Sequence, residues 1–278
     1  MKVGHGGWRL REELLTHAVL LPLGLLEAFP FFWMIGTSLK TLPETVHFWP
    51  WPASPQWSNY SSVWHDPSVP FGRYLFVTAV SSLSVTASVL LSALGAGYAF
   101  GVLRWRGQGL VFGLYMATMM VPFEVILIPN YLTILKLHWT NTFWALIVPW
   151  AANVFSVFLV TQAFRGLPRD FQEAAMLDGC GHFAYLRKIA APLVSPALAT
   201  AAIFAFLGSW NSLMWPLVVT DDTRMRTIEM GLSSFVQAES SNVHLVMAGS
   251  VIALMPVLLL FLAMQRRFIE GLAAGVKG

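Results

Sequence analysis

The chain has 278 residues, of which 56% are hydrophobic and only 11% are Asp, Glu, Lys or Arg. A typical soluble domain is about 25% charged, so these residues are too few to cover a soluble globule of this size. The single cysteine, Cys180, excludes an intramolecular disulfide framework and a cysteine-based metal cluster. The net charge of +3 does not indicate a nucleic-acid partner, because the basic residues cluster at the ends of apolar stretches, as membrane topology would place them.

Long apolar stretches recur along the chain, each near the roughly 20 residues that a transmembrane helix needs. No charged residue lies between Arg73 and Arg104, and the last apolar stretch, from Leu245 to Met264, also contains none. We expect the first stretch to be retained, because its apolar run continues past Glu27 and no small-residue cleavage site follows. The sequence predicts an all-α membrane protein, a single transmembrane domain over residues 1–278 with six spans. These are placed at about 14–39, 74–103, 110–135, 142–164, 196–220 and 244–265.

Basic residues predict the orientation of these spans, because cytoplasmic loops carry an excess of Lys and Arg. Of the 17 basic residues, twelve fall on one side and five on the other. We therefore place the twelve, and both termini, in the cytoplasm, which agrees with an even number of spans. The cytoplasmic set is Lys2, Arg9, Arg11, Arg104, Arg106, Arg165, Arg169, Arg187, Lys188, Arg266, Arg267 and Lys277, and the external set is Lys40, Arg73, Lys136, Arg224 and Arg226.

Two segments are then external, at residues 40–73 and 220–243. The first is rich in Pro and Trp, with a Trp cluster at 49–57. Aromatic residues at span ends normally mark the membrane interface, so we interpret this cluster as an interfacial anchor. The alternative is a surface that meets an external partner.

Two Gly-x-x-x-Gly patterns, Gly97 with Gly101 and Gly109 with Gly113, indicate helices that pack closely. Such spacing also arises by chance in Gly-rich apolar sequence, so it predicts a packed bundle and nothing more specific. No internal repeat of the kind expected in many secondary transporters is visible.

Polar residues within the predicted spans are candidates for function, because an ionisable group in lipid costs at least about 2.5 kcal/mol and tends to face a bundle interior or a wet path. For Glu27 and Glu124 two interpretations stay open, a pathway or gating contact and an interhelix hydrogen bond. Pro122 and Pro129 should kink or break the helix around Glu124, which favours the pathway for that span. Asn153 and Asn211 are two further polar residues within the predicted spans.

The motif SWNSLMWPL on the fifth predicted span suits a polyhydroxylated ligand. An amide both donates and accepts hydrogen bonds, and an aromatic face can stack on the C–H side of a sugar. Alternatively, Asn211 joins two helices and the Trp residues lie at an interface. A phosphate should prefer a basic pocket, and no Arg or Lys lies inside a span, which favours a neutral sugar. The candidate substrate pathway is Glu124, Asn153, Trp210 and Asn211.

No catalytic or nucleotide-binding pattern occurs in the sequence. G-x-x-x-x-G-K-[ST], H-E-x-x-H and G-x-S-x-G are all missing, and the seven histidines show no metal-ligand spacing. We therefore predict that the chain is not an enzyme and holds no cofactor or metal of its own.

A polar segment at residues 173–196 separates the fourth and fifth predicted spans on the cytoplasmic side. Asp170 with Glu173 three residues later resembles a capping box, which predicts a short helix over 171–177. Gly179 and Gly181 should end that helix, since glycine ends helices readily.

A second short helix is expected over 182–190, ended by Pro192. Two short helices hinged at glycine make a compact docking surface, on which Ala174 and Ala175 would let another surface approach closely. The alternative is a loop helix that lies on the membrane surface, with Glu173 only capping it.

This segment resembles the EAA loop of the inner-membrane permeases of binding-protein-dependent ABC importers, whose pattern is roughly EAAxxDGA, a hydrophobic helix and a proline. Cys180 stands where the family usually has alanine. VPFEVILIPNY, Asn141-Thr142, AFRGLPRDFQEAAMLDG, SWNSLMWPL and QRRFIEGLAAGVKG resemble the maltose-type carbohydrate permeases, a subclass that also takes up glycerol 3-phosphate. The matching loop residues are Glu173, Ala174, Ala175, Asp178, Gly179, Ile189, Pro192 and Pro196.

The resemblance implies a multi-pass protein of the bacterial or archaeal cytoplasmic membrane. It also implies a second homologous permease subunit, two cytoplasmic ATPase subunits that bind the ATP, and an extracytoplasmic solute-binding protein. The family's EAA helix sits in a cleft of the ATPase, and the C-terminal QRRFIEGL resembles a tail that also contacts the ATPases in some members. The ATPase-coupling residues implied here are Glu173, Ala174, Ala175, Asp178, Gly179, Arg187 and Pro192.

We therefore expect a membrane-spanning permease subunit of an ATP-driven importer for a sugar or sugar-like solute, with glycerol 3-phosphate import as the alternative. A stand-alone secondary transporter that uses Glu27 and Glu124 is a more distant alternative. A membrane enzyme is disfavoured, because no plausible nucleophile, base or metal set is present.

Overall fold

The computed structural model describes residues 5–239 and 241–276, and every regular element in this part of the chain is helical. The predicted all-α fold is therefore confirmed. Three helices are long: α1 (His5–Ser38), α3 (Phe71–Gly101) and α14 (Val243–Val276). The shorter ones are α2 (Ser58–Trp64), α4 (Gln108–Ala117), α5 (Phe123–Lys136), α6 (Phe143–Ile147), α7 (Val154–Arg165), α8 (Asp170–Leu177), α9 (His182–Tyr185), α10 (Ala191–Leu193), α11 (Ser195–Trp210), α12 (Met214–Val219) and α13 (Ile228–Ala238).

Three straight helical segments in the described chain are long and apolar enough to cross a membrane, namely Thr16–Ser38, Phe71–Gly101 and Val243–Leu262. Three more candidate spans are pairs of helices with a sharp bend between them, so the described chain holds up to six spans if each pair counts as one. The pairs and their bends are Gln108–Met120 with Phe123–Lys136 (98°), Phe143–Trp150 with Val154–Arg165 (42°), and His182–Leu193 with Ser195–Trp210 (79°).

The bends have local causes in the sequence. Pro122 precedes α5 with an extended backbone (ψ 145°), because it has no N–H to donate and its ring disfavours helical continuation. The predicted break at Pro122 is confirmed, whereas α5 continues through Pro129. The predicted span over 196–220 contains two helices rather than one, because α11 ends at Trp210 and α12 begins only at Met214.

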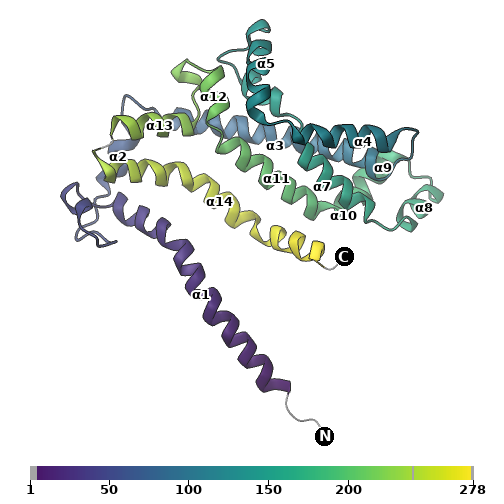
Figure 1. The fold of residues 1–278 in the computed structure, drawn as a ribbon, viewed down its shortest axis with the longest axis horizontal. Helices are drawn as coiled ribbons and strands as arrows, with labels where there is room; N and C mark the ends of the chain where they lie inside the picture. The colour runs from purple at the N-terminus through teal and green to yellow at the C-terminus, as the bar shows by residue number, and fades with distance from the viewer. Residues whose placement is uncertain (1–4, 240, 277–278) are drawn as a thin grey trace. The chain divides into compact units, whose positions relative to one another are not determined.

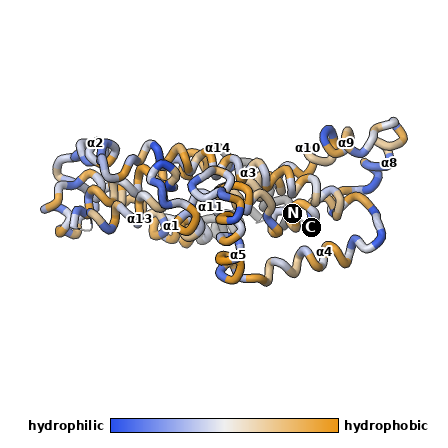
Figure 2. The backbone as a smooth tube through the Cα atoms, turned by 90° about the horizontal axis from the view of Figure 1, so that it is seen from above, coloured by the Kyte–Doolittle hydropathy of each residue, from blue (hydrophilic) through white to orange (hydrophobic). Residues whose placement is uncertain are grey.

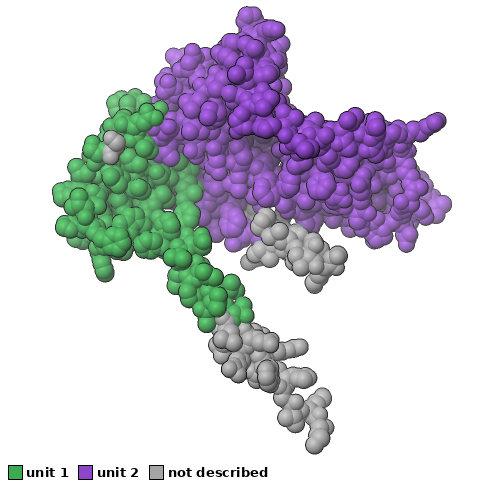
Figure 3. Space-filling view, viewed as in Figure 1, with its two compact units in different colours: residues 1–69, 234–254 green, residues 70–233, 255–278 purple. Residues whose placement is uncertain are grey.

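The chain divides into two compact units, residues 1–69 with 234–254 and residues 70–233 with 255–278 (Figure 3). In the first unit, the segment after α1 is anchored by hydrogen bonds from the buried Asn59 amide to the carbonyls of Ser38 and Lys40, both 2.9 Å long. The predicted interfacial residues Trp49, Trp51 and Trp57 are all exposed, with 52–70% of their surface accessible. Their anchoring role stays a prediction.

In the second unit, α3 packs lengthwise against α7 and α11 (Figure 1). Two glycines permit this contact, because a Cβ atom at Gly97 would lie 2.8 Å from Cγ1 of Val160, and one at Gly101 would lie 2.6 Å from Cβ of Phe164. A Cβ atom at Gly109 or Gly113 would meet nothing within 4 Å. One of the two Gly-x-x-x-Gly patterns is therefore a close helix contact within the unit, and the other is not.

Candidate functional site

We call Asp170–Leu193 the coupling segment; it contains α8, α9, a π-helical turn at Leu186–Ala190 and α10. Its polar residues project at one end of the second unit, around α8 and α9 (Figure 2). The predicted capping box is wrong, because Arg169 is the N-cap residue of α8, Asp170 already lies inside the helix, and no cap side chain makes a hydrogen bond. The Glu173 side chain is therefore exposed rather than occupied in capping.

The predicted glycine stop after α8 is a Schellman turn. Gly179 has φ +75°, a left-handed conformation in which glycine is favoured. The N–H of Cys180 donates to the carbonyl of Ala175 (2.9 Å) and the N–H of Gly179 to that of Met176 (3.0 Å). This pair of hydrogen bonds fixes the direction in which the chain leaves α8.

The second predicted helix extends further than expected. Helical structure runs from His182 through the π-turn to Leu193, and Pro192 lies inside it rather than ending it. Arg187, Lys188 and Pro192 are exposed, and the direction changes at Val194, before α11.

One face of the coupling segment is buried in the chain itself. Ala175, Tyr185 and Ala190 belong to an apolar cluster that also contains Val160 and Phe164 of α7. Ala175 is 6% exposed and Ala190 fully buried, whereas Ala174 is exposed. The two alanines of the motif therefore differ: Ala175 holds α8 against the helices, and Ala174 faces outward with Glu173, Asp178 and Gly179.

A groove of about 1260 Å³ lies between the coupling segment and the turn that joins α3 to α4. Glu173 of α8 lies on this groove together with three arginines, Arg104, Arg165 and Arg169. The Arg165 guanidinium is held over the Phe112 ring, 4.8 Å from its centroid, so its position is defined. The groove therefore offers a basic, partly apolar surface next to the exposed side of α8.

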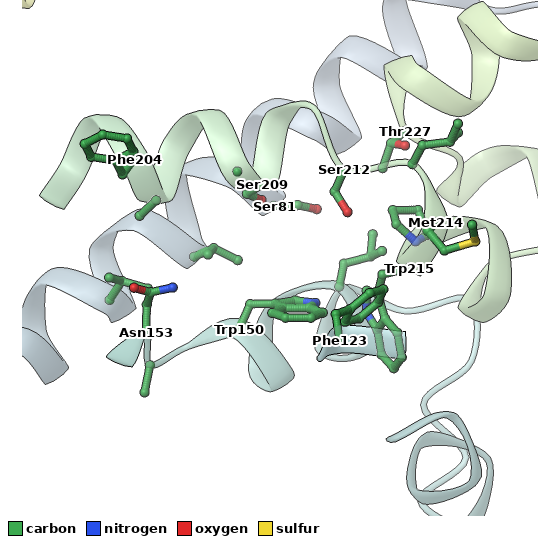
Figure 4. A pocket seen from close by; sticks show the side chains of 18 residues that line it. Ser81, Phe123, Trp150, Asn153, Phe204, Ser209, Ser212, Met214, Trp215 and Thr227 are labelled. Carbon is green, nitrogen blue, oxygen red and sulfur yellow. The ribbon is translucent and has the colours of Figure 1, made fainter. Parts of the chain in front are cut away.

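A second cavity, of about 410 Å³, lies within the helix bundle of the second unit (Figure 4). Aromatic rings form one wall: Trp150 and Trp215 meet edge to face with centroids 5.8 Å apart, and Phe123 lies 5.5 Å from Trp150. The Trp215 indole N–H donates to the carbonyl of Ala145 over 2.9 Å, which fixes the ring. Hydroxyl side chains lie across the cavity from this wall, and Asn153 lies beside Trp150; the hydroxyl residues are Ser81, Ser209, Ser212 and Thr227.

The structure separates the four predicted pathway residues. Asn153 lines the cavity, and its Oδ1 caps α7 by accepting from the N–H of Ser156 (2.9 Å). Trp210 is buried and stacks on Phe206 with centroids 5.3 Å apart. Neither Trp210, Asn211 nor Glu124 lines the cavity.

Asn211 is exposed at the C-terminal end of α11, and Glu124 is exposed in the first turn of α5. Glu27 is exposed on α1. Sequence reasoning missed Ser81, Thr227 and Trp150, which line the cavity. For Ser81 the sequence offered one signal, a serine within an uncharged apolar stretch. Nothing in the local sequence distinguished it from the neighbouring serines Ser82 and Ser84 as a cavity residue. The side chains of the tail motif from Arg266 onward lie outside the described residues.

Comparisons with known proteins agree with this architecture. The profile of the family described as "Binding-protein-dependent transport system inner membrane component" matches residues 71–273. The arabinooligosaccharides transport system permease protein AraQ of Bacillus subtilis is 34% identical over 261 residues, which cover 92% of each chain. The sn-glycerol-3-phosphate transport system permease protein UgpE of Yersinia enterocolitica is 29% identical over 277 residues, 95% of this chain and 97% of that one.

A solved structure of a bacterial ABC transporter involved in the import of the acidic polysaccharide alginate has the same fold. It superposes with a TM-score of 0.79 at 22% identity, over 96% of this chain and 100% of the other. The profile match alone covers more than half of the chain, from α3 into α14. The chain belongs to the family of inner membrane components of binding-protein-dependent transport systems.

Proposed function

We propose that this chain is one of two permease subunits of an ATP-driven importer for a sugar or sugar-like solute. Family membership supports this, together with relatives named for arabinooligosaccharide and glycerol-3-phosphate transport. The partners would be a second homologous permease, two cytoplasmic ATPase subunits and an extracytoplasmic solute-binding protein. ATP would bind to the ATPase subunits, in agreement with the lack of a phosphate-binding loop in this sequence.

The observation that carries the proposal is the two-sided character of the coupling segment. Ala175, Tyr185 and Ala190 fix its inner face in the apolar core, whereas Glu173 and Asp178 are exposed on its outer face. A docked ATPase would therefore contact a rigid projection rather than a loose loop. Because the inner face shares its cluster with α3, α7 and α11, a push on the projection moves these helices as packed bodies.

The groove beside α8 extends this docking surface. Its arginines suit acidic residues of the ATPase, and Glu173 on the same groove suits a basic one. The orientation that places this end in the cytoplasm, with both termini, follows from the distribution of basic residues along the sequence. The protein would then reside in a bacterial or archaeal cytoplasmic membrane, surrounded by lipid.

The proposal is tested by Glu173→Lys and, separately, Gly179→Pro, in the transporter purified through a tag on this chain. The first variant reverses an exposed charge, and the second is incompatible with φ +75° at that position. We expect both to lower ATPase co-purification and solute uptake at least tenfold. Lys136→Glu, a charge reversal at an exposed residue outside the coupling segment, is the control and should keep both co-purification and uptake. Survival of both activities in both variants would overturn the proposal.

A further inference from the structure

We infer that the 410 Å³ cavity of the second unit binds an uncharged, polyhydroxylated solute, and that the hydroxyls of Ser81 and Thr227 are hydrogen-bond partners of that solute. The inference rests on the proposed function for its setting, and it names the substrate class that this chain selects. Its evidence lies in the chemistry of the cavity wall (Figure 4).

Ser81 and Thr227 are each only 4% exposed, and neither hydroxyl has a hydrogen-bond partner in the described chain. Buried polar atoms in native proteins nearly always have a partner, because an unpaired one loses its bonds to water without replacement. Two other hydroxyls on α3 follow this rule, since Thr78 donates to the carbonyl of Tyr74 (2.8 Å) and Thr86 to the carbonyl of Ser82 (2.7 Å), whereas the Ser82 hydroxyl does not. Ser81 and Thr227 depart from it where they line a cavity.

The rest of the wall has the composition of a saccharide site. Ser209 and Ser212 add two hydroxyls, which both donate and accept and so match alcohol groups, and Asn153 adds an amide nitrogen that donates, because its Oδ1 already accepts from Ser156. Trp150 and Phe123 offer broad apolar faces opposite the two serines (Figure 4). A few placed polar groups on a mostly apolar wall, in a cavity of this size, are typical of small-molecule sites.

The wall also excludes a charged solute. None of the eighteen residues that line this cavity in the described chain is Asp, Glu, His, Lys or Arg. An anion in such a site would lose its hydration without meeting an opposite charge, which is strongly unfavourable. Homology does not settle this point, because the relatives include transporters named for an uncharged oligosaccharide, for glycerol 3-phosphate and for the acidic polysaccharide alginate.

Ser82 provides a matched control. Its hydroxyl is also buried and unpartnered and lies on the same helix, but Ser82 does not line the cavity. Ser81→Ala and Ser82→Ala therefore remove the same group at adjacent positions. For Thr227, Thr227→Val removes the hydroxyl and keeps the shape, and Thr227→Ser keeps the hydroxyl.

The experiment measures solute binding by equilibrium dialysis to the full chain in lipid nanodiscs. The uncharged probes are lactose and arabinotriose, and the charged ones are glycerol 3-phosphate and a triuronate. We expect an uncharged probe to bind and neither anion to compete with it. Ser81→Ala and Thr227→Val should each weaken binding about three- to tenfold, as expected for a lost hydrogen bond, with Ser82→Ala and Thr227→Ser close to wild type.

Binding of an anion in preference to both uncharged probes, binding of none of the probes, or equal effects of Ser81→Ala and Ser82→Ala would overturn the inference. The same variants are then assayed for ATP-dependent uptake in the purified transporter with its partners. Selective binding without uptake in wild type would overturn the proposed function and leave the inference standing. ATP-dependent uptake that Ser81→Ala and Thr227→Val do not change would overturn the inference and leave the proposed function standing.

Discussion

The hydroxyl of Tyr98 on α3 and Nδ1 of His182, the first residue of α9, are hydrogen-bonded at 2.9 Å. The Tyr98 ring also meets Phe164 edge to face (5.8 Å between centroids) and lies 6.3 Å from Tyr185. Tyr98 therefore joins α3 to the coupling segment by one hydrogen bond and a ring contact with Tyr185, and to α7 by a ring contact with Phe164. Under the proposed function, Tyr98 would link ATPase docking at the segment to movement of α3.

Tyr98→Phe keeps the ring contacts and removes the bond to His182. We expect thermal stability of the purified chain to fall by about 0.5–1.5 kcal/mol, the usual worth of one hydrogen bond. Maximal uptake should fall several-fold with solute affinity unchanged, because the coupling segment is loosened and the solute cavity is not. Tyr115→Phe is the control, since Tyr115 takes part in a side-chain hydrogen bond of the described chain only through its backbone carbonyl, which accepts from Thr118. Equal effects of the two substitutions would contradict a special role for Tyr98.

Gly101→Ala should separate α3 from α7. The added Cβ would lie 2.6 Å from Cβ of Phe164 and 3.1 Å from the carbonyl oxygen of Thr161, and neither atom belongs to a flexible side-chain end. We expect a loss of about 1–3 kcal/mol, typical of overpacking, measured by thermal denaturation in detergent. Gly95→Ala on the same helix meets nothing within 4 Å and should be neutral or slightly stabilising. An unchanged melting temperature for Gly101→Ala would show that the helices can move apart freely.

Asn141 fastens the turn after α12. Its Oδ1 accepts from the N–H groups of Asp221 and Asp222, both at 2.9 Å, and its backbone has φ +59°. Asn141→Gly loses the amide but suits the backbone, whereas Asn141→Ala loses the amide and is strained. We expect the alanine variant to be less stable than the glycine variant by about 1–2 kcal/mol. Hydrogen exchange at 220–222 should rise in both variants, and unchanged protection there would contradict the assignment.

Acid should loosen the same turn. The side-chain hydrogen bond from Asn141 is the main cause that lowers the pKa of the Asp221 carboxyl below its ordinary value. A lowered pKa in the folded state stabilises the turn above the unfolded pKa, and this contribution disappears as the pH falls through the folded value. We expect amide protection at 220–222 to decline below about pH 4, near the ordinary aspartate value, after correction for intrinsic exchange. Asn141→Gly should flatten this dependence, and a decline of equal size in that variant would argue against Asn141 as the cause.

The sequence by itself determined the class of protein, the break at Pro122 and the glycine turn after α8. These features depend on hydropathy over about 20 residues, or on the backbone restrictions of single Pro and Gly residues, so they can be read from short windows. Two features could not be predicted from such short windows, namely the helix break within 196–220 and the position of Asp170 in α8. The segment 196–220 is mostly apolar, yet α11 ends before Asn211 and a second helix follows it. Asp170 occupies the first turn of α8 rather than its cap.

Only the tertiary structure decided which polar residues share a site. Ser81 and Thr227 are separated by 146 positions and meet at one cavity, whereas the adjacent Ser81 and Ser82 differ in whether they line it. Likewise, Ala174 and Ala175 are identical in type, yet one is exposed and the other buried. On a helix, adjacent residues point about 100° apart, so the face that each presents is fixed by which helices pack around it, and no local pattern contains that information.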